Sequence, residues 1–383
     1  MKRSEHFILR EINGVPYLIP YGQALLELKK SCRLSKAGVF LWNLLEREHS
    51  LDELVTLYAE SIHIPEEERA ALMKEAEQII ESLAARGCLV KEDTSSEKVA
   101  ERILRAGNLT IRMKGATQAF SERFDSFYCN AAEIVDQEVL ICLSEPSQHA
   151  VGKVLMRNSE LTVLEQGEQY VLLFPSKTHV EEAHLSKDAS LAVFYCHPPY
   201  TDTFREELFH AIRFTFLYLA QKRRMVVLHS ASILYQGRAW LFSAQARTGK
   251  STHTNLWKEL LQVPLLNGDL NLLAMENGQP VIHGIPWCGT SEIYDTETHP
   301  LGGIILLKRG EEDYVKELSP DVQRLLVLQR LISPAWTAQM LECNLCLVEE
   351  LIPLIYVARL HCTPEFSAVT AVKAAIDEYL ASN

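Results

Sequence analysis

Residues 244–252 combine a lysine, hydroxyl side chains and a glycine in the spacing of a phosphate-binding loop. An apolar strand over 239–242 precedes them and a helix is expected over 253–261, which is the context that a G-x-x-x-x-G-K-[ST] loop requires. In such a loop, backbone N–H groups and the lysine bind phosphate oxygens, and the serine ligates Mg²⁺. The predicted nucleotide-binding residues are Ala244, Gln245, Ala246, Arg247, Thr248, Gly249, Lys250, Ser251 and Thr252.

Two positions depart from this pattern. Ala244 replaces the first glycine, and Arg247 stands at the tight-turn position before Thr248. A non-glycine residue at positive φ costs about 1 kcal/mol, so the loop can still form. The alternative interpretation is a chance Gly-Lys-Ser at the start of a helix.

An acidic partner is needed to bind Mg²⁺ or to take a proton from an attacking hydroxyl. Asp269 ends a short apolar run after the expected helix, where the next strand would approach the loop. His229 ends an apolar strand over 225–229 and is expected to reach the same cleft. The predicted catalytic residues are Asp269, His229 and Lys250, and the predicted metal ligands are Ser251 and Asp269. A turn aspartate and a core or surface histidine are the alternatives.

The composition limits the possible classes of protein. The chain has 383 residues, 47% hydrophobic and 23% charged, which indicates two or three globular domains. A net charge of -12 without a basic stripe disfavours nucleic acid as a partner. No apolar run approaches the roughly 20 residues of a membrane span, and no signal peptide is evident, so a cytoplasmic location is expected.

Cysteine usage agrees with a reducing compartment. The nine cysteines are an odd number and are scattered, which favours free thiols over disulfides. The close pair Cys343 and Cys346 lacks further ligands at zinc spacing, so two half-buried core thiols are the better interpretation.

The elements that must position these residues divide the chain. Residues 6–34 predict three short strands, with a hairpin turn at Asn13-Gly14. Ser35 and Ser50 are predicted to cap two helices, the second with Glu53 as a capping box. A third helix is expected over Pro65–Ala85.

The chain beyond these helices predicts a linker and a larger domain. A polar linker is expected over 93–100, sheet-like alternation over 101–200 and a long helix over 203–222. A hairpin through Gln236-Gly237 leads to the strand before the phosphate loop. The fold class is therefore α+β or α/β and multidomain. Residues 1–92 form a winged-helix-like unit of three strands and three helices, and 101–383 form a phosphate-loop domain with its core at about 205–310.

Residues 6–90 resemble the PqqD-like family of peptide-recognition domains. The resemblance lies in the hairpin, in 33–42 (RLSKAGVFLW), in 51–54 (LDEL) and in 83–89 (LAARGCL). It implies that a leader peptide adds a strand to 24–34 and packs on the helix over 65–85. The implied peptide-binding residues are Leu28, Lys29, Lys30, Arg33, Leu72, Ala76 and Ile79.

The cationic members of that set have more than one interpretation. Lys29, Lys30 and Arg33 would suit an acidic leader, or they protect an edge strand from aggregation. A DNA-binding winged helix is the rival fold. Residues 1–92 carry 12 Lys and Arg against 15 Asp and Glu, a net charge of -3 that disfavours it.

Residues from about 205 to 310 resemble the HPr kinase family. The resemblance lies in 228–232 (LHSAS), 240–243 (WLFS), 249–252 (GKST), 266–269 (LNGD) and 284–289 (GIPWCG). It implies phosphorylation of a serine hydroxyl with a nucleotide, ATP or GTP, and Mg²⁺, and it implies that His229 orients Asp269. These kinases commonly have two adjacent aspartates where this chain has Gly268-Asp269.

The two resemblances together predict a kinase of a ribosomally synthesised precursor peptide. The N-terminal unit would hold the leader and raise the effective concentration of the core to be phosphorylated. A catalytically weak nucleotide-binding adaptor and a kinase of a small molecule or carrier protein are the alternatives. Residues 284–290 either line a pocket or form a packed turn. Monomer and homo-oligomer both stay open.

Overall fold

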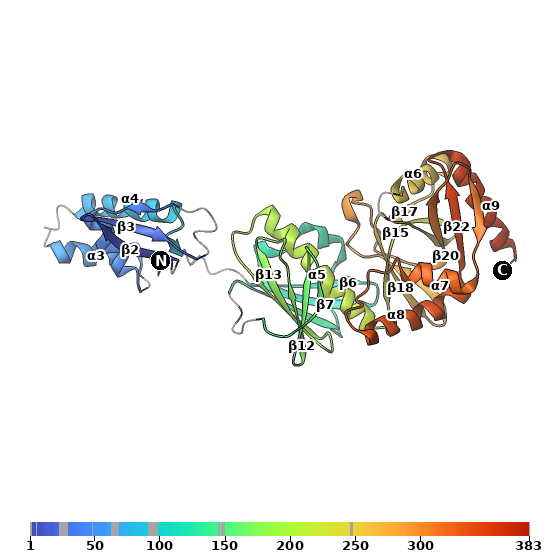
Figure 1. The fold of residues 1–383 in the computed structure, drawn as a ribbon, viewed down its shortest axis with the longest axis horizontal. Coiled ribbons are helices and arrows are strands. Elements are labelled where there is room, and N and C mark those ends of the chain that lie inside the picture. Colours follow the sequence, from blue (N-terminus) through green and yellow to red (C-terminus); the bar gives the residue numbers. More distant parts are fainter. Residues whose placement is uncertain are drawn as a thin grey trace. The chain divides into compact units, whose positions relative to one another are not determined.

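The computed structural model describes residues 2–4, 6–22, 30–47, 49–62, 69–90, 99–144, 146, 150–245 and 248–382. The chain divides into two compact units, Met1–Glu97 and Lys98–Asn383 (Figure 1). Both units contain helices and sheets, so the fold is mixed α and β. Over the described ranges, no helix has the length and apolar character needed to cross a bilayer.

The first unit packs helices on a small sheet. Its described strands β2 (Phe7–Ile12), β3 (Val15–Pro20) and β4 (Cys32–Arg33) form the antiparallel order β2-β3-β4, while β1 (Lys2–Arg3) pairs with β5 (Leu89–Val90). The helices are α2 (Lys36–Leu44), α3 (Leu51–Ile62) and α4 (Arg69–Ala85). The hairpin at Asn13 and Gly14 is confirmed, with φ of 50° and 77°.

Both predicted helix caps in this unit are confirmed. The Ser35 hydroxyl accepts from the Gly38 N–H at 3.0 Å. Ser50 and Glu53 exchange two bonds, of 2.8 and 3.2 Å, in a reciprocal capping box. These caps let α2 and α3 begin where their apolar faces, with Trp42 and Leu54, enter the core.

One predicted boundary changes in the structure, and two others lie wholly or partly outside the described residues. The strand predicted over 24–34 is described only as β4, since residues 23–29 lie outside the described ranges, with Leu28 and Lys29 among them. The Pro65 start of the third helix also lies outside them. The predicted linker is two residues too long, because Val99 and Ala100 pair with Ala116 and Gly115 in β6.

The second unit begins with a large sheet, as the alternation over 101–200 predicts. In its described part this sheet has nine strands. In sheet order they are β10 (Lys153–Arg157), β11 (Thr162–Gln166), β12 (Gln169–Leu173), β13 (Val180–Ser186), β14 (Leu191–Cys196), β9 (Gln137–Cys142), β7 (Leu109–Ala116), β6 (Val99–Ala106) and β8 (Tyr128–Cys129). Helix α5 (Asp202–Lys222) packs on β13 and confirms the predicted long helix.

A second sheet carries the phosphate loop. As described over 226–362, it has eight strands: β15 (Val226–Tyr235), β16 (Arg238–Ser243), β17 (Leu265–Asn267), β18 (Leu270–Glu276), β19 (Gln279–His283), β20 (Thr298–Arg309), β21 (Tyr314–Glu317) and β22 (Tyr356–Cys362). The predicted hairpin at Gln236 and Gly237 joins β15 to β16. Strands β16, β20 and β22 are parallel, so their carboxyl ends lie at one edge.

Helices cover both faces of these parallel strands (Figure 1). Helices α6 (Lys250–Leu261) and α9 (Phe366–Ser382) share a core with Trp240 and Phe242. Helices α7 (Pro320–Leu328) and α8 (Ala338–Leu351) contribute to a different core, with Ile304 and Val357. This layering leaves the carboxyl edge as the place where ligands bind in open α/β sheets.

Candidate active site

Strand β15 lies between β18 and β16, and its two neighbours assemble the site. On one side it pairs with β18, where His229 lies opposite Leu270, and then in the same register with β17. On the other side it pairs with β16 from Ser230, which lies opposite Ser243. Asp269 directly precedes Leu270, and the phosphate loop directly follows Ser243. The histidine is therefore fixed between the predicted acid and the predicted loop.

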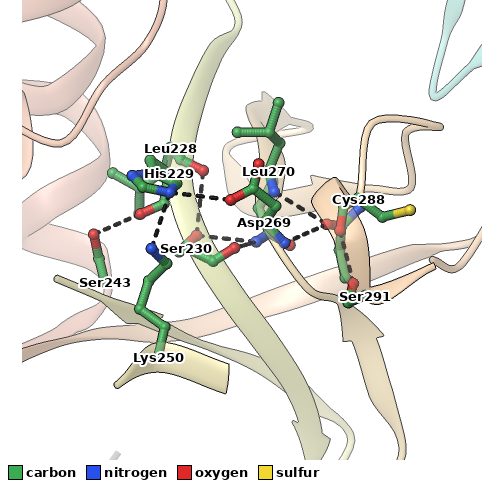
Figure 2. Close-up of polar contacts among 11 residues, drawn as sticks. Leu228, His229, Ser230, Ser243, Lys250, Asp269, Leu270, Cys288 and Ser291 are labelled. Carbon is green, nitrogen blue, oxygen red and sulfur yellow. Dashed lines mark hydrogen bonds and ion pairs between the residues drawn. The ribbon is translucent and has the colours of Figure 1, made fainter. Parts of the chain in front are cut away.

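The three predicted catalytic side chains meet at one nitrogen (Figure 2). The Nε2 atom of His229 lies 3.0 Å from Asp269 Oδ1 and 2.9 Å from Lys250 Nζ. A neutral imidazole Nε2 either donates its proton to the carboxylate or accepts from the ammonium, but it cannot do both. Asp269 and Lys250 thus compete for the same histidine atom.

Burial and charge act in opposite directions on the pKa of Asp269. Burial raises it, but the hydrogen bond with His229 and the positive charges of His229, Lys250 and Arg213 lower it further, so the pKa lies below its usual value. The pKa of Lys250 is also lowered, mainly by burial and in part by Arg330, while Asp269 opposes the shift. Asp269 is an ionised carboxylate at neutral pH.

A buried polar network holds the turn that carries Asp269. Asn267 Oδ1 accepts from the N–H groups of Asp269 and Leu270 at 2.9 and 3.0 Å. Asn271 Nδ2 donates to the carbonyl and the hydroxyl of Ser230 at 2.7 and 2.9 Å. Both asparagines are almost fully buried. These bonds supply partners for backbone N–H and C=O groups that hydrogen bonds between strands alone would leave unpaired.

A serine occupies the space beside Gly268 where a second carboxylate would begin. A Cβ added to Gly268 would lie 1.9 Å from Ser291 Oγ and 2.6 Å from Ser291 Cβ. That hydroxyl donates to the Cys288 carbonyl at 2.7 Å. The packing of this loop therefore leaves room for only one carboxylate at the Gly268-Asp269 pair, that of Asp269.

The phosphate loop ends at an open helix N-terminus. Gly249, at φ 110°, is the N-cap of α6 and makes no side-chain capping bond, so the first N–H groups of the helix can bind an anion. Thr248 and Gly249 line a pocket of about 380 Å³, and Ser251 lines a hydroxyl-rich pocket of about 290 Å³ that includes Gly268.

The remaining loop residues divide into three groups. Gln245 and Thr248 line a further pocket of about 460 Å³, and Thr252 lines the pocket beside Gly249. Ala244 is buried in the core under the loop, so only its backbone is placed to meet a ligand. Ala246 and Arg247 lie outside the described residues.

One part of the segment 284–290 packs in the core, and another part lines a pocket. Trp287 is 2% exposed, lies among phenylalanines and donates to the Phe209 carbonyl at 3.0 Å. Thr290 lines the hydroxyl-rich pocket. The two alternatives left open by the sequence thus apply to different residues of the same stretch.

The first unit has a groove between β4 and α4. Its volume is about 470 Å³, and Arg33 and Ile79 line it together with Gln78, Ser82 and Arg86. Leu72 and Ala76 were expected to contact a peptide here, but they are 5% and 0% exposed and belong to the core. Lys30 is exposed and does not line this groove.

Several site residues were not predicted from the sequence. Arg123 donates to the Gly289 carbonyl at 2.9 Å and so ties the segment after β7 to the loop beside Asp269. Arg213 on α5 adds a positive charge near that carboxylate. Asn267 and Asn271 were also missed, and the signal that could have found them is a polar residue recurring within apolar strands.

The comparisons with known proteins give little further guidance. No family model matches the sequence, and no curated protein does. Among solved structures, the Hpr(Ser) kinase/phosphatase from Coxiella burnetii is similar at 13% identity and a TM-score of 0.25, over 41% of this chain and 97% of that one.

We expect the Gly268→Ala change to destabilise the second unit, because the new Cβ overlaps Ser291. The loss should be about 1–3 kcal/mol, typical of overpacking. Adding Ser291→Gly should recover much of it, since the next neighbour, the Cys288 carbonyl oxygen, lies at 3.3 Å. Urea unfolding of both single variants and the double variant measures the coupling, and additive effects would contradict the overlap.

We also expect Asp269→Asn to lower the pKa of Lys250 further. The carboxylate stabilises the ammonium form, so without it Lys250 loses its proton at a lower pH. An NMR titration of the lysine side chain measures this shift. Asp295→Asn, which removes a carboxylate that is bound to His299, is the matched control and should leave Lys250 unchanged. An equal shift in both variants would rule out the direct interaction.

Proposed function

We propose that the chain is a nucleotide- and Mg²⁺-dependent kinase that phosphorylates a Ser or Thr hydroxyl of a ribosomally synthesised precursor peptide. One observation carries the proposal. Asp269 and Lys250 converge on His229 Nε2 beside the uncapped N-terminus of α6. A carboxylate that takes the hydroxyl proton and a lysine that binds the phosphates are groups that phosphoryl transfer to a hydroxyl uses, and the histidine is placed to orient the carboxylate.

The residues present fit a nucleotide with Mg²⁺. Among the described residues, no three His, Cys, Asp or Glu side chains gather into a group that could hold a metal ion. Mg²⁺ at kinase sites usually takes one or two protein ligands and completes its shell with phosphate oxygens and water. Ser251 and Asp269 would be those ligands, and the metal would neutralise charge on the phosphates.

The chemistry of the chain's own residues follows from this arrangement. The acceptor oxygen attacks the terminal phosphorus, and the bond from that phosphorus to the bridging oxygen breaks, releasing the nucleoside diphosphate. The hydroxyl proton passes to the Asp269 carboxylate, which His229 orients. Lys250 and the α6 N–H groups hold the phosphate oxygens.

The N-terminal unit supplies the peptide specificity in this proposal. The groove between β4 and α4 offers an edge strand and a helix face, the two surfaces that β-augmentation uses. Arg33 and Arg86, against the single lining acid Glu75, give it a net positive charge for an acidic leader. On this basis we assign the first unit as PqqD-like and the second as HPr kinase-like.

A second candidate is a nucleotide-binding adaptor that delivers the peptide to another enzyme. The packing of Ser291 against Gly268 favours it, because the loop has no room for the paired carboxylates common in the related kinases. Such an adaptor would bind nucleotide and peptide without forming a phosphorylated product.

Intact-mass spectrometry of a precursor peptide encoded beside the gene separates these candidates. We expect the peptide to gain one phosphate after incubation with the protein, ATP or GTP, and Mg²⁺. Lys250→Ala and Asp269→Asn should each lower the rate by at least about 100-fold. Lys258→Ala, at the other end of α6, is the control and should stay active. An unchanged mass, with nucleotide and peptide both bound, would refute the kinase and support the adaptor.

Leader binding to the full chain tests the groove. We expect Arg33→Glu and Ile79→Glu each to weaken the binding of a fluorescent leader peptide by about tenfold or more. The first change removes a charge-assisted bond and the second an apolar contact. Fluorescence anisotropy measures the affinity. Lys74→Glu, on α4 but outside the groove, is the matched control. Phosphorylation that is indifferent to Arg33→Glu would indicate a small molecule or carrier protein as the acceptor.

A further inference from the structure

A cationic pocket lies next to the phosphate loop. Its volume is about 460 Å³, and it lies at the carboxyl ends of β16 and β20, beside the middle of β22 and the end of α7. Four of the residues that line it are cations and none is an acid: Lys308, Arg309, Arg330 and Arg359. Ser243, Gln245 and Thr248 complete the side that faces the loop. In a chain with a net charge of -12, this concentration of positive charge needs a cause.

The fold brings these cations together from three separate segments of the chain. Arg359 on β22 lies opposite Leu306 on β20, and Lys308 follows two residues later on the same face. Arg330 follows α7, and its carbonyl accepts from the His229 N–H at 3.0 Å. An isolated bridge between Leu228 and Leu331 fixes the same segment. Arg330 is thus attached to the backbone of the catalytic histidine.

Acidic partners do not compensate this charge. Among the described residues, no carboxylate forms an ion pair with Lys308, Arg330 or Arg359, and Arg330 Nε is buried without a hydrogen-bond partner. The pKa of His361 is lowered by burial and by the positive charges of Lys308, Arg359 and the neighbouring Lys316. Like charges that share a pocket repel one another, and a bound anion relieves that repulsion.

We propose that this pocket is a phosphate-binding site, in which Lys308, Arg330 and Arg359 bind the oxygens of a di- or triphosphate. Planar guanidinium groups bind phosphate oxygens in pairs, and three or four cations match the charge of such an anion. Because Gln245 and Thr248 line the pocket, its occupant touches the phosphate loop. The anion is either the phosphate chain of the nucleotide or a pyrophosphate bound beside it.

Calorimetry with pyrophosphate tests the site without relying on turnover. We expect Arg359→Gln and Lys308→Gln each to weaken the binding of pyrophosphate by about tenfold. Arg330→Gln should weaken it by more, because the Nε atom of Arg330 is buried. Lys316→Gln, one strand further out on β21 opposite Arg359, removes the same charge outside the pocket and is the matched control. Thermal unfolding of each variant verifies its fold.

A second titration on protein saturated with ADP identifies the source of the anion. Competition between ADP and pyrophosphate would mean that the pocket holds the nucleotide's own phosphates, and simultaneous binding would mean a separate anion. Absence of pyrophosphate binding, or affinity that falls in Lys250→Ala but not in the three pocket variants, would overturn the proposal. The outcome is separable from the proposed kinase activity, since arginine-dependent pyrophosphate binding stands even when no peptide is phosphorylated.

Discussion

The position of β15 between two neighbours is the constraint on which the second unit depends. On one side it pairs with β18 and then, in the same register, with β17, so the turn with Asp269 lies beside His229 and Ser230. On the other side Ser243, the last residue of β16 before the phosphate loop, lies opposite Ser230. The turn at Gly268 and Asp269 interrupts the ladder between β17 and β18, and buried unpaired backbone groups are costly. The side chains of Asn267 and Asn271 meet that need.

The sequence predicted the residues that could do the chemistry of the site better than the contacts that hold those residues in place. The phosphate loop and Asp269 could be found because each follows an apolar strand, and strand ends gather at a sheet edge. The prediction that His229 ends a strand was wrong, because β15 continues past it to Tyr235. Nothing local shows that Arg330 lies beside His229 or that Ser291 fills the space at Gly268. Both contacts join segments that are distant in the chain, and one sequence contains no record of such pairings.

In the first unit, the signals that worked were local. An Asn-Gly turn and two hydroxyl caps are decided within four residues, and all three are present. The expected peptide contacts on α4 were partly wrong for a related reason. The apolar stripe of an amphipathic helix marks the face that enters the core, which takes Leu72 and Ala76. The adjoining face, with Ile79, lines the groove.

The shared nitrogen of His229 couples ligand binding to the state of the acid. While Lys250 donates to Nε2, that atom has no proton for Asp269. A phosphate at the start of α6 attracts the Lys250 ammonium, and Nε2–H is then able to donate to the carboxylate at the position already 3.0 Å away. By linkage, whatever strengthens the His229–Asp269 bond also strengthens phosphate binding by Lys250. In the proposed kinase, the acid is therefore oriented most firmly when there is a phosphoryl group to transfer.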